Sequence, residues 1–276
     1  MKKLEPPQIL LTNDDGIRSP GLWAAAKALS ELGFVHVVAP RDQFSGAGRS
    51  LPSTSDGKVN PQIMHVNEKD WTVYAVGGTP AQAVLHAVLE ILPARPDLVV
   101  SGINYGENLG TGITVSGTVG AALEAAALGI PALAVSLETG VEFHLSYSSE
   151  IDFTAAGHFT TCFGRLLLQH RLPQDVDVLK IDIPLEASSQ TPWEITRLSS
   201  RRYYVPTPSQ RRSLDEAGPI GYRLSEDALE HPKDSDVYVV RIKRIVSVTP
   251  LSLDMTSRVD LTDFETQIRS QADLST

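Results

Sequence analysis

Two adjacent carboxylates follow the first apolar run of the chain and are its clearest candidates for chemistry. Asp14 and Asp15 stand in the segment Thr12-Asn13-Asp14-Asp15-Gly16. Two like charges in one turn repel, and each loses hydration when a fold buries it, so the pair calls for a compensating cation. A hard divalent ion with oxygen ligands would supply that charge. The alternative for this segment alone is an Asx turn that caps a helix.

A second polar loop, Pro40–Ser50, follows another apolar run. It contains Ser45-Gly46-Ala47-Gly48, which is small enough to let the backbone approach a ligand closely. The hydroxyl of Ser45 is a candidate neutral ligand for a hard cation. Taken alone, this composition is also typical of a flexible loop.

A third loop combines glycines with two amides and leads into a helix start. The segment from Ser101 to Gly112 holds Asn104 and Asn108, four residues apart. Ser116-Gly117-Thr118 then predicts the capped N-terminus of a helix, where free backbone N–H groups favour an anion. The sequence therefore indicates a site for a cation and an anionic group together.

Other common site types are not found in the sequence. The glycines match neither a dinucleotide fingerprint nor a P-loop lysine motif, and there is no G-x-S-x-G elbow for a serine nucleophile. The seven histidines lack zinc-type spacing, and each is expected on the surface or in the core. Glu124 lies in a predicted helix and is expected to be solvated or paired in the core.

The elements that must position these loops alternate between strand and helix patterns. This alternation is typical of βαβ units in a mostly parallel sheet, with ligands beyond the carboxyl ends of the strands. Ser19-Pro20 and Thr79-Pro80 each predict a capped helix start with proline in the first turn. Predicted strands are Gln8–Asn13, Phe34–Ala39, Trp71–Val76, Leu98–Ser101, Ala132–Leu137 and Val176–Ile183, and predicted helices are 19–32, 79–92, Gly117–Leu128 and Asp152–His170.

The composition of the chain changes after Pro184. Prolines and glycines punctuate this part, and the pairs Arg201-Arg202 and Arg211-Arg212 flank a Tyr/Pro segment. We expect residues 1–185 to form an α/β catalytic core. Residues 186–276 are expected to form an extended hairpin and a C-terminal segment that serve in oligomerisation, with 247–255 as a strand that pairs outside its own sheet. A solvated face is the alternative for the paired arginines.

Composition narrows the class of protein. The net charge of −9 gives no basic face for large nucleic acids. Cys162 is the only cysteine, so it cannot form an intrachain disulfide, and we expect it to be buried in the core. Met1–Gln8 has no signal-peptide pattern, and no apolar run approaches the length of a membrane span. These features predict a cytoplasmic protein with no membrane partner.

Five segments together resemble the SurE family of survival proteins, which are divalent-metal-dependent nucleotidases. Their order and spacing make the resemblance far more specific than any single loop. The segments are ILLTNDDGIRSPG (9–21), VVAPRDQFSGAG (37–48), PDLVVSGINYGENLG (96–110), SGTVGAALEAAALGIPALAVS (116–136) and SVTPLSLDMT (247–256).

The resemblance implies a fold, a metal site and a reaction. The implied fold is a doubly wound, mostly parallel Rossmann-like α/β sheet with a C-terminal extension used in oligomerisation. The implied metal ligands are Asp14, Asp15, Ser45 and Asn104, with Mg²⁺ or Mn²⁺ bound and with the two aspartates as the catalytic residues. Asn108, Ser116, Gly117 and Thr118 would contact phosphate.

The implied substrates are nucleoside 5'- and 3'-monophosphates, with short polyphosphate as a further substrate of some members. A homodimer or homotetramer with exchanged C-terminal segments is also implied. Val115 and Ser252 depart from residues common in the family, which keeps open a non-catalytic nucleotide- or phosphate-binding module on the same fold. A glycosyl transferase with a metal–diphosphate site is a second alternative, but it needs a further domain.

Overall fold

The computed structural model describes residues 6–66 and 69–271, so most of the N-terminal segment discussed above lies outside it. In this part of the chain a nine-stranded sheet has the order β3-β4-β2-β1-β5-β6-β7-β11-β8. Strands β1, β2, β4, β5, β6 and β7 are parallel, whereas β3 and β11 run antiparallel to β4 and β7. The strands are β1 (Gln8–Thr12), β2 (Phe34–Pro40), β3 (Val59–Val66), β4 (Lys69–Val76), β5 (Leu98–Tyr105), β6 (Ala132–Leu137), β7 (Val178–Ile183), β8 (Trp193–Ile195) and β11 (Val246–Leu251).

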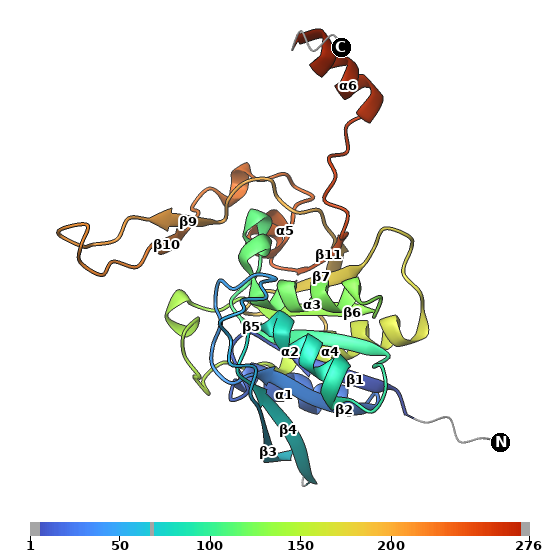
Figure 1. The fold of residues 1–276 in the computed structure, drawn as a ribbon. Coiled ribbons are helices and arrows are strands. Elements are labelled where there is room, and N and C mark those ends of the chain that lie inside the picture. The colour runs from blue at the N-terminus through green and yellow to red at the C-terminus, as the bar shows by residue number, and fades with distance from the viewer. Residues whose placement is uncertain (1–5, 67–68, 272–276) are drawn as a thin grey trace.

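Helices cover both faces of the sheet (Figure 1). Helices α1 (Pro20–Leu29) and α4 (Thr154–Gln169) pack on one face, and α2 (Pro80–His86) and α3 (Gly117–Ala127) pack on the other. Side chains of β1 alternate between the two layers, because Ile9 and Leu11 join the first and Leu10 joins the second. The predicted doubly wound α/β fold is therefore confirmed.

Local chemistry explains several element boundaries. β6 spans the six residues predicted for it, and all six are buried, as expected for a central parallel strand. At the start of α2, the hydroxyl of Thr79 accepts from the backbone of Gln82, whose side chain accepts from the backbone of Thr79. Pro80 fills the first helical position of this capping box, where no N–H partner is needed.

Some predicted boundaries are wrong, and one strand was not predicted at all. The predicted strand 98–101 continues to Tyr105, with an irregularity between Ser101 and Asn104, because the pairing with β6 resumes at Ser136. Helix α1 ends at Leu29 and not at residue 32. Strand β3 was not predicted, because its residues alternate poorly and most are exposed at the sheet edge.

The prediction that 247–255 pairs outside its own sheet is also wrong. Its first residues form β11, which pairs with β7 on one side and with β8 on the other. Val246 and Val248 are buried in the main core, and this apolar contact favours pairing within the sheet.

Cys162 does not lie in the core, contrary to expectation. The buried stripe of α4 contains Ala156, Phe159, Phe163 and Leu167, which recur at helical spacing. Cys162 falls on the opposite face of the helix and is exposed. Helical phase therefore decides its place, and the apolar composition of the surrounding segment does not.

The rest of the C-terminal part projects from the sheet (Figure 1). Strands β9 (Tyr204–Thr207) and β10 (Gly221–Leu224) form the expected hairpin. The short helix α5 (Asp236–Tyr238) packs near β11, whereas the exposed helix α6 (Leu261–Gln271) stands apart from the body. No helix within residues 6–66 and 69–271 has the length and apolar character needed to cross a bilayer.

Candidate active site

The site lies where the chain leaves β1 for one side of the sheet and returns in β5 on the other. β1 pairs with β2 and β5, so the gap between the β1 and β5 carboxyl ends is a topological switch point. Asn13 shapes the turn after β1 through its side chain, which exchanges two hydrogen bonds with the backbone of Gly16 at 3.1 and 3.2 Å. Gly16 has φ +92°, a value that favours glycine. This turn sets Asp14 and Asp15 at the strand end.

Asp14 is almost fully buried against the start of α3. Its Oδ1 accepts a short hydrogen bond from the hydroxyl of Thr118. A Cβ added at Gly117 would lie 2.7 Å from the Asp14 Cβ, so only glycine allows this approach. Burial raises the pKa of Asp14, and hydrogen bonds from Thr118 and from the backbone of Gly117 oppose that rise. The helix start therefore supports this carboxylate.

Asp15 is also buried, and its environment is less favourable to charge. It accepts from Gln43 Nε2 at 3.1 Å and from the backbone N–H of Tyr105 at 3.1 Å. Burial, and then the negative charge of Asp14, raises the pKa of Asp15 well above its usual range. No salt bridge joins either aspartate to a cationic side chain among the described residues, so the ionised pair needs a further positive charge.

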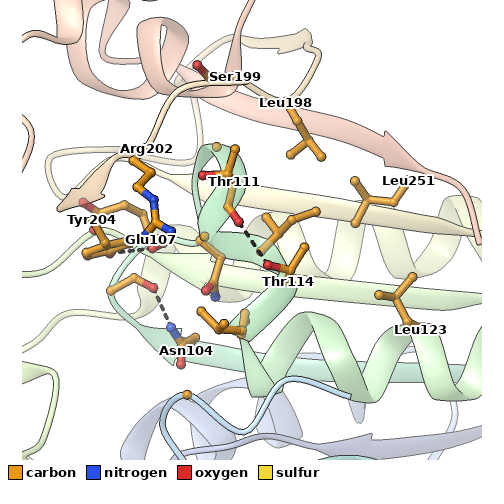
Figure 2. Close-up of a pocket in the computed structure, with 18 of the residues that line it drawn as sticks. Asn104, Glu107, Thr111, Thr114, Leu123, Leu198, Ser199, Arg202, Tyr204 and Leu251 are labelled. Atoms are coloured by element: carbon orange, nitrogen blue, oxygen red, sulfur yellow. Dashed lines mark hydrogen bonds between the residues drawn. The ribbon is translucent and has the colours of Figure 1, made fainter. Parts of the chain in front are cut away.

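Two neutral oxygens complete the predicted ligand set. Asn104 Nδ2 donates to the carbonyl of Gly106 at 2.6 Å, which leaves the amide oxygen on the other side of the group (Figure 2). Ser45 is exposed, and its loop is tied down by a hydrogen bond from the N–H of Phe44 to the carbonyl of Asp14 at 2.8 Å. Two carboxylates, an amide and a hydroxyl form a donor set that fits a hard divalent cation.

All four predicted ligands line one large cavity of about 1650 Å³. Glu107, Arg202 and Tyr204 also line it (Figure 2). Asn108 and Ser116 belong to the same lining. Gly117 and Thr118 lie beneath Asp14 and do not belong to the lining. The cavity exceeds the usual size of a small-molecule site, because it continues under the C-terminal part of the chain.

The loop that carries Asn108 is held from below by buried charges that the sequence reading missed. Lys180 forms an ion pair with Asp182 and another, at 3.3 Å, with Asp236. Asp182 accepts from the N–H of Asn108 at 2.7 Å, and Lys180 donates to the carbonyl of Asn108 at 2.8 Å. Asp236 accepts from the N–H of Gly110 at 2.9 Å. A lysine and an aspartate on one face of an otherwise apolar strand, VLKIDI, were the available sign.

Glu107 is a second buried carboxyl beside the site. Its Oε1 accepts a short hydrogen bond from the hydroxyl of Tyr203, while Oε2 has no hydrogen-bond partner among the residues described. Burial raises the pKa of Glu107 to about 7. Between pH 4.5 and 7 the folded chain therefore retains a proton that the unfolded chain releases, so the stability of the fold declines as the pH rises across this range and levels off above it.

We expect Glu107→Gln to remove this pH dependence. The amide keeps an acceptor for Tyr203 and carries no charge. At pH 9 the free energy of unfolding of the variant should therefore exceed that of the wild type by on the order of 1 to 3 kcal/mol. At pH 5 the gain should fall to about a quarter of this value, because most of the linkage energy accumulates between pH 5 and 7. Urea denaturation at both pH values measures it, with the exposed Glu31→Gln as the matched control. Equal differences at pH 5 and pH 9 would contradict the assignment.

Glu124 lies where it was expected. Glu124 is buried and paired with Arg49, its Oε2 lying 2.6 Å from the Arg49 Nε, as a core-paired carboxylate. No group of three or more His, Cys, Asp or Glu side chains arranged for a metal ion occurs in the described part of the chain. The candidate cation site thus depends on two carboxylates and neutral donors.

The fold and the site together define a class of protein. An open α/β sheet holds two buried carboxylates, neutral oxygens and a helix start at its switch point, and this donor set fits a divalent cation beside a small anionic ligand.

Comparisons with known proteins identify the family within this class. The family model described as "Survival protein SurE" matches residues 9–205. The 5'-nucleotidase SurE of Thermococcus gammatolerans is 42% identical, over 92% of this chain and 92% of its own. The 5'-nucleotidase SurE of Methanosarcina acetivorans is 42% identical, over 96% and 99%. The crystal structure of the SurE protein from Aquifex aeolicus matches 97% of this chain and 100% of its own, with TM-score 0.73 and 32% identity. The chain belongs to the SurE family.

Proposed function

We propose that the chain is a divalent-metal-dependent 5'-nucleotidase that hydrolyses nucleoside 5'-monophosphates, and also 3'-monophosphates, to nucleoside and phosphate. The observation that carries this proposal is the buried Asp14 and Asp15 pair at the switch point, with neutral oxygens in the same cavity. The names of the two archaeal relatives support the substrate class. Short polyphosphate is proposed as a further substrate.

Asp14, Asp15, Ser45 and Asn104 would hold Mg²⁺ or Mn²⁺. Such a cation supplies a Lewis acid that polarises a phosphoryl oxygen and lowers the pKa of a bound water. Such a cation would offset the burial and the negative charge of Asp14, which raise the pKa of Asp15. Asn108 and Ser116, which line the cavity, are proposed to contact the phosphate. Gly117 and Thr118 were expected to do so as well, but they lie beneath Asp14 and are proposed to hold its carboxylate instead.

Metal dependence is the first test of this function. We expect phosphate release from AMP in the presence of Mg²⁺ or Mn²⁺, and its loss by about a hundredfold or more after extended incubation with excess EDTA. Readdition of the metal should restore the rate. Undiminished release in EDTA would contradict metal catalysis. A chain that binds AMP with metal but releases no phosphate would be the non-catalytic binding module.

The C-terminal part is proposed to assemble a homodimer or homotetramer. Helix α6 carries exposed Leu261, Phe264 and Ile268 at helical spacing, and none of its residues is buried within its own chain. Such an apolar stripe gains stability when a second copy covers it. The division of the chain at residue 185 is kept only as a proposal about which part assembles the oligomer. It does not separate two folding units, because β8 and β11 lie beyond residue 185 and complete the sheet.

We expect Phe264→Ser with Ile268→Ser to weaken this assembly. Removing two apolar contacts should raise the dissociation constant by roughly tenfold or more. Light scattering across a dilution series measures it, and Gln267→Ser on the same helix is the control. A wild-type chain that is monomeric at every concentration, or a double variant that assembles like the wild type, would contradict the role of α6.

A further inference from the structure

Three aromatic rings gather at one side of the cavity and have no part in the proposed metal site. They are His144, Tyr204 and Tyr222, and all three line the same cavity as Asp14 and Asp15. The Tyr204 and Tyr222 rings meet edge to face with centroids 5.3 Å apart, and His144 lies nearly parallel to Tyr222 at 6.2 Å. This group joins the loop after β6 to the β9–β10 hairpin.

Hydrogen bonds fix the orientation of both tyrosine rings. The Tyr222 hydroxyl and His144 Nδ1 are hydrogen-bonded at 2.8 Å, and the Tyr204 hydroxyl donates to the carbonyl of Glu107 at 2.6 Å. Tyr204 is largely covered, whereas Tyr222 remains 43% exposed. A rigid aromatic face that meets the cavity loses little conformational entropy when a flat ligand stacks on it.

The aromatic group is joined to the metal site by direct contacts. Gln43 Nε2 donates both to Asp15 Oδ1 at 3.1 Å and to the carbonyl of His144 at 2.8 Å. Gly106, whose carbonyl accepts from Asn104, packs so tightly on the imidazole that an added Cβ would lie 2.6 Å from His144 Nε2. Two side chains, Gln43 and His144, therefore separate Tyr222 from Asp15.

We propose that Tyr222 forms the nucleobase subsite, with the base of the substrate stacked on its ring and with His144 as the residue that positions the ring. This proposal rests on the proposed function. The metal site takes the phosphate end of the substrate, and Tyr222 takes the base at the other end. Pro206, which pairs with Tyr222 across the hairpin, and Ile220 also line the cavity and add apolar surface. Every nucleobase has a π-face, and stacking on an aromatic side chain contributes about 1 to 3 kcal/mol.

This subsite favours a nucleobase without selecting one base strongly. The Tyr222 hydroxyl is already bonded to His144, so the ring offers a face to the base and not a hydrogen bond to its edge. We expect AMP, GMP, CMP and UMP to differ in kcat/KM by less than about tenfold, because stacking depends little on the identity of the base.

A pair of substrates separates base recognition from the reaction itself. AMP carries a base, whereas ribose 5-phosphate presents the same phosphate and sugar without one. With Mn²⁺, Tyr222→Ala should lower kcat/KM for AMP by about five- to a hundredfold and change that for ribose 5-phosphate by less than about twofold. Tyr222→Trp keeps a stacking face and should retain the AMP value within about threefold.

Controls make the outcomes distinct. Leu214→Ala changes an exposed residue on the same hairpin, outside the cavity lining, and should leave both substrates unaffected. Equal losses for AMP and ribose 5-phosphate in Tyr222→Ala, or no loss for either, would overturn the subsite. A wild-type chain that hydrolyses neither substrate would instead refute the proposed function. Calorimetric binding of adenosine would then still test the subsite, since Tyr222→Ala must weaken it.

Discussion

Asp14→Asn and Asp15→Asn should each lower kcat/KM for AMP by about a hundredfold or more, which corresponds to a loss of roughly 3 kcal/mol of transition-state stabilisation. Each change removes one of the two charges that hold the proposed cation. Initial rates of phosphate release at saturating Mn²⁺ measure both effects.

The fold should survive these two substitutions. Removal of one charge relieves repulsion between buried carboxylates, and this gain offsets the loss of one accepted hydrogen bond at Thr118 or Tyr105. Thermal unfolding without metal should therefore shift by only a few degrees. Added Mn²⁺ should stabilise the wild type and not the variants. Asp70→Asn, at an exposed position, is the control. Near-normal activity in either variant would show that its carboxylate is no ligand.

Much of the fold could be predicted from the sequence, because local features fix it. β6 is an apolar run between a glycine turn and a loop, and α2 carries its own capping box. The positions of Asp14 and Asn104 at one edge of the sheet follow from a general property of parallel sheets. The carboxyl ends of β1 and β5, which are neighbouring parallel strands, lie together at the switch point.

Other features depend on distant contacts and could not be predicted in this way. β5 continues through Asn104 because it pairs with β6, which the glycines in its sequence do not reveal. Cys162 is exposed because of the helical phase of α4, and Gly117 and Thr118 face Asp14 because α3 starts beside β1. The partners of Lys180 include Asp236, 56 residues away, and the carbonyl of Asn108, 72 residues away, so composition alone gives no indication of the cluster.

The buried cluster of Lys180, Asp182 and Asp236 leads to the largest expected effect on stability. Lys180→Met keeps much of the side-chain volume but leaves two carboxylates without their cation at zero exposure. Loss of one partner from a buried ion pair costs about 3 to 5 kcal/mol of unfolding free energy. The cluster also clamps the backbone of Asn108 on both sides, so kcat/KM should fall by about tenfold or more as this loop moves.

The pH dependence of the loss identifies its cause. Burial already raises the pKa of Asp182 to about 6 beside Lys180, and without the lysine it must rise further. The folded variant then binds more protons than the unfolded chain, so its unfolding free energy falls as the pH rises from 5 to 8. Urea denaturation should therefore show a larger deficit at pH 8 than at pH 5. Lys27→Met, at an exposed helix position, should change little, and adding Asp182→Asn to Lys180→Met should restore part of the stability. An equal deficit at both pH values would instead assign the loss to packing, since only an uncompensated carboxylate is relieved by a proton.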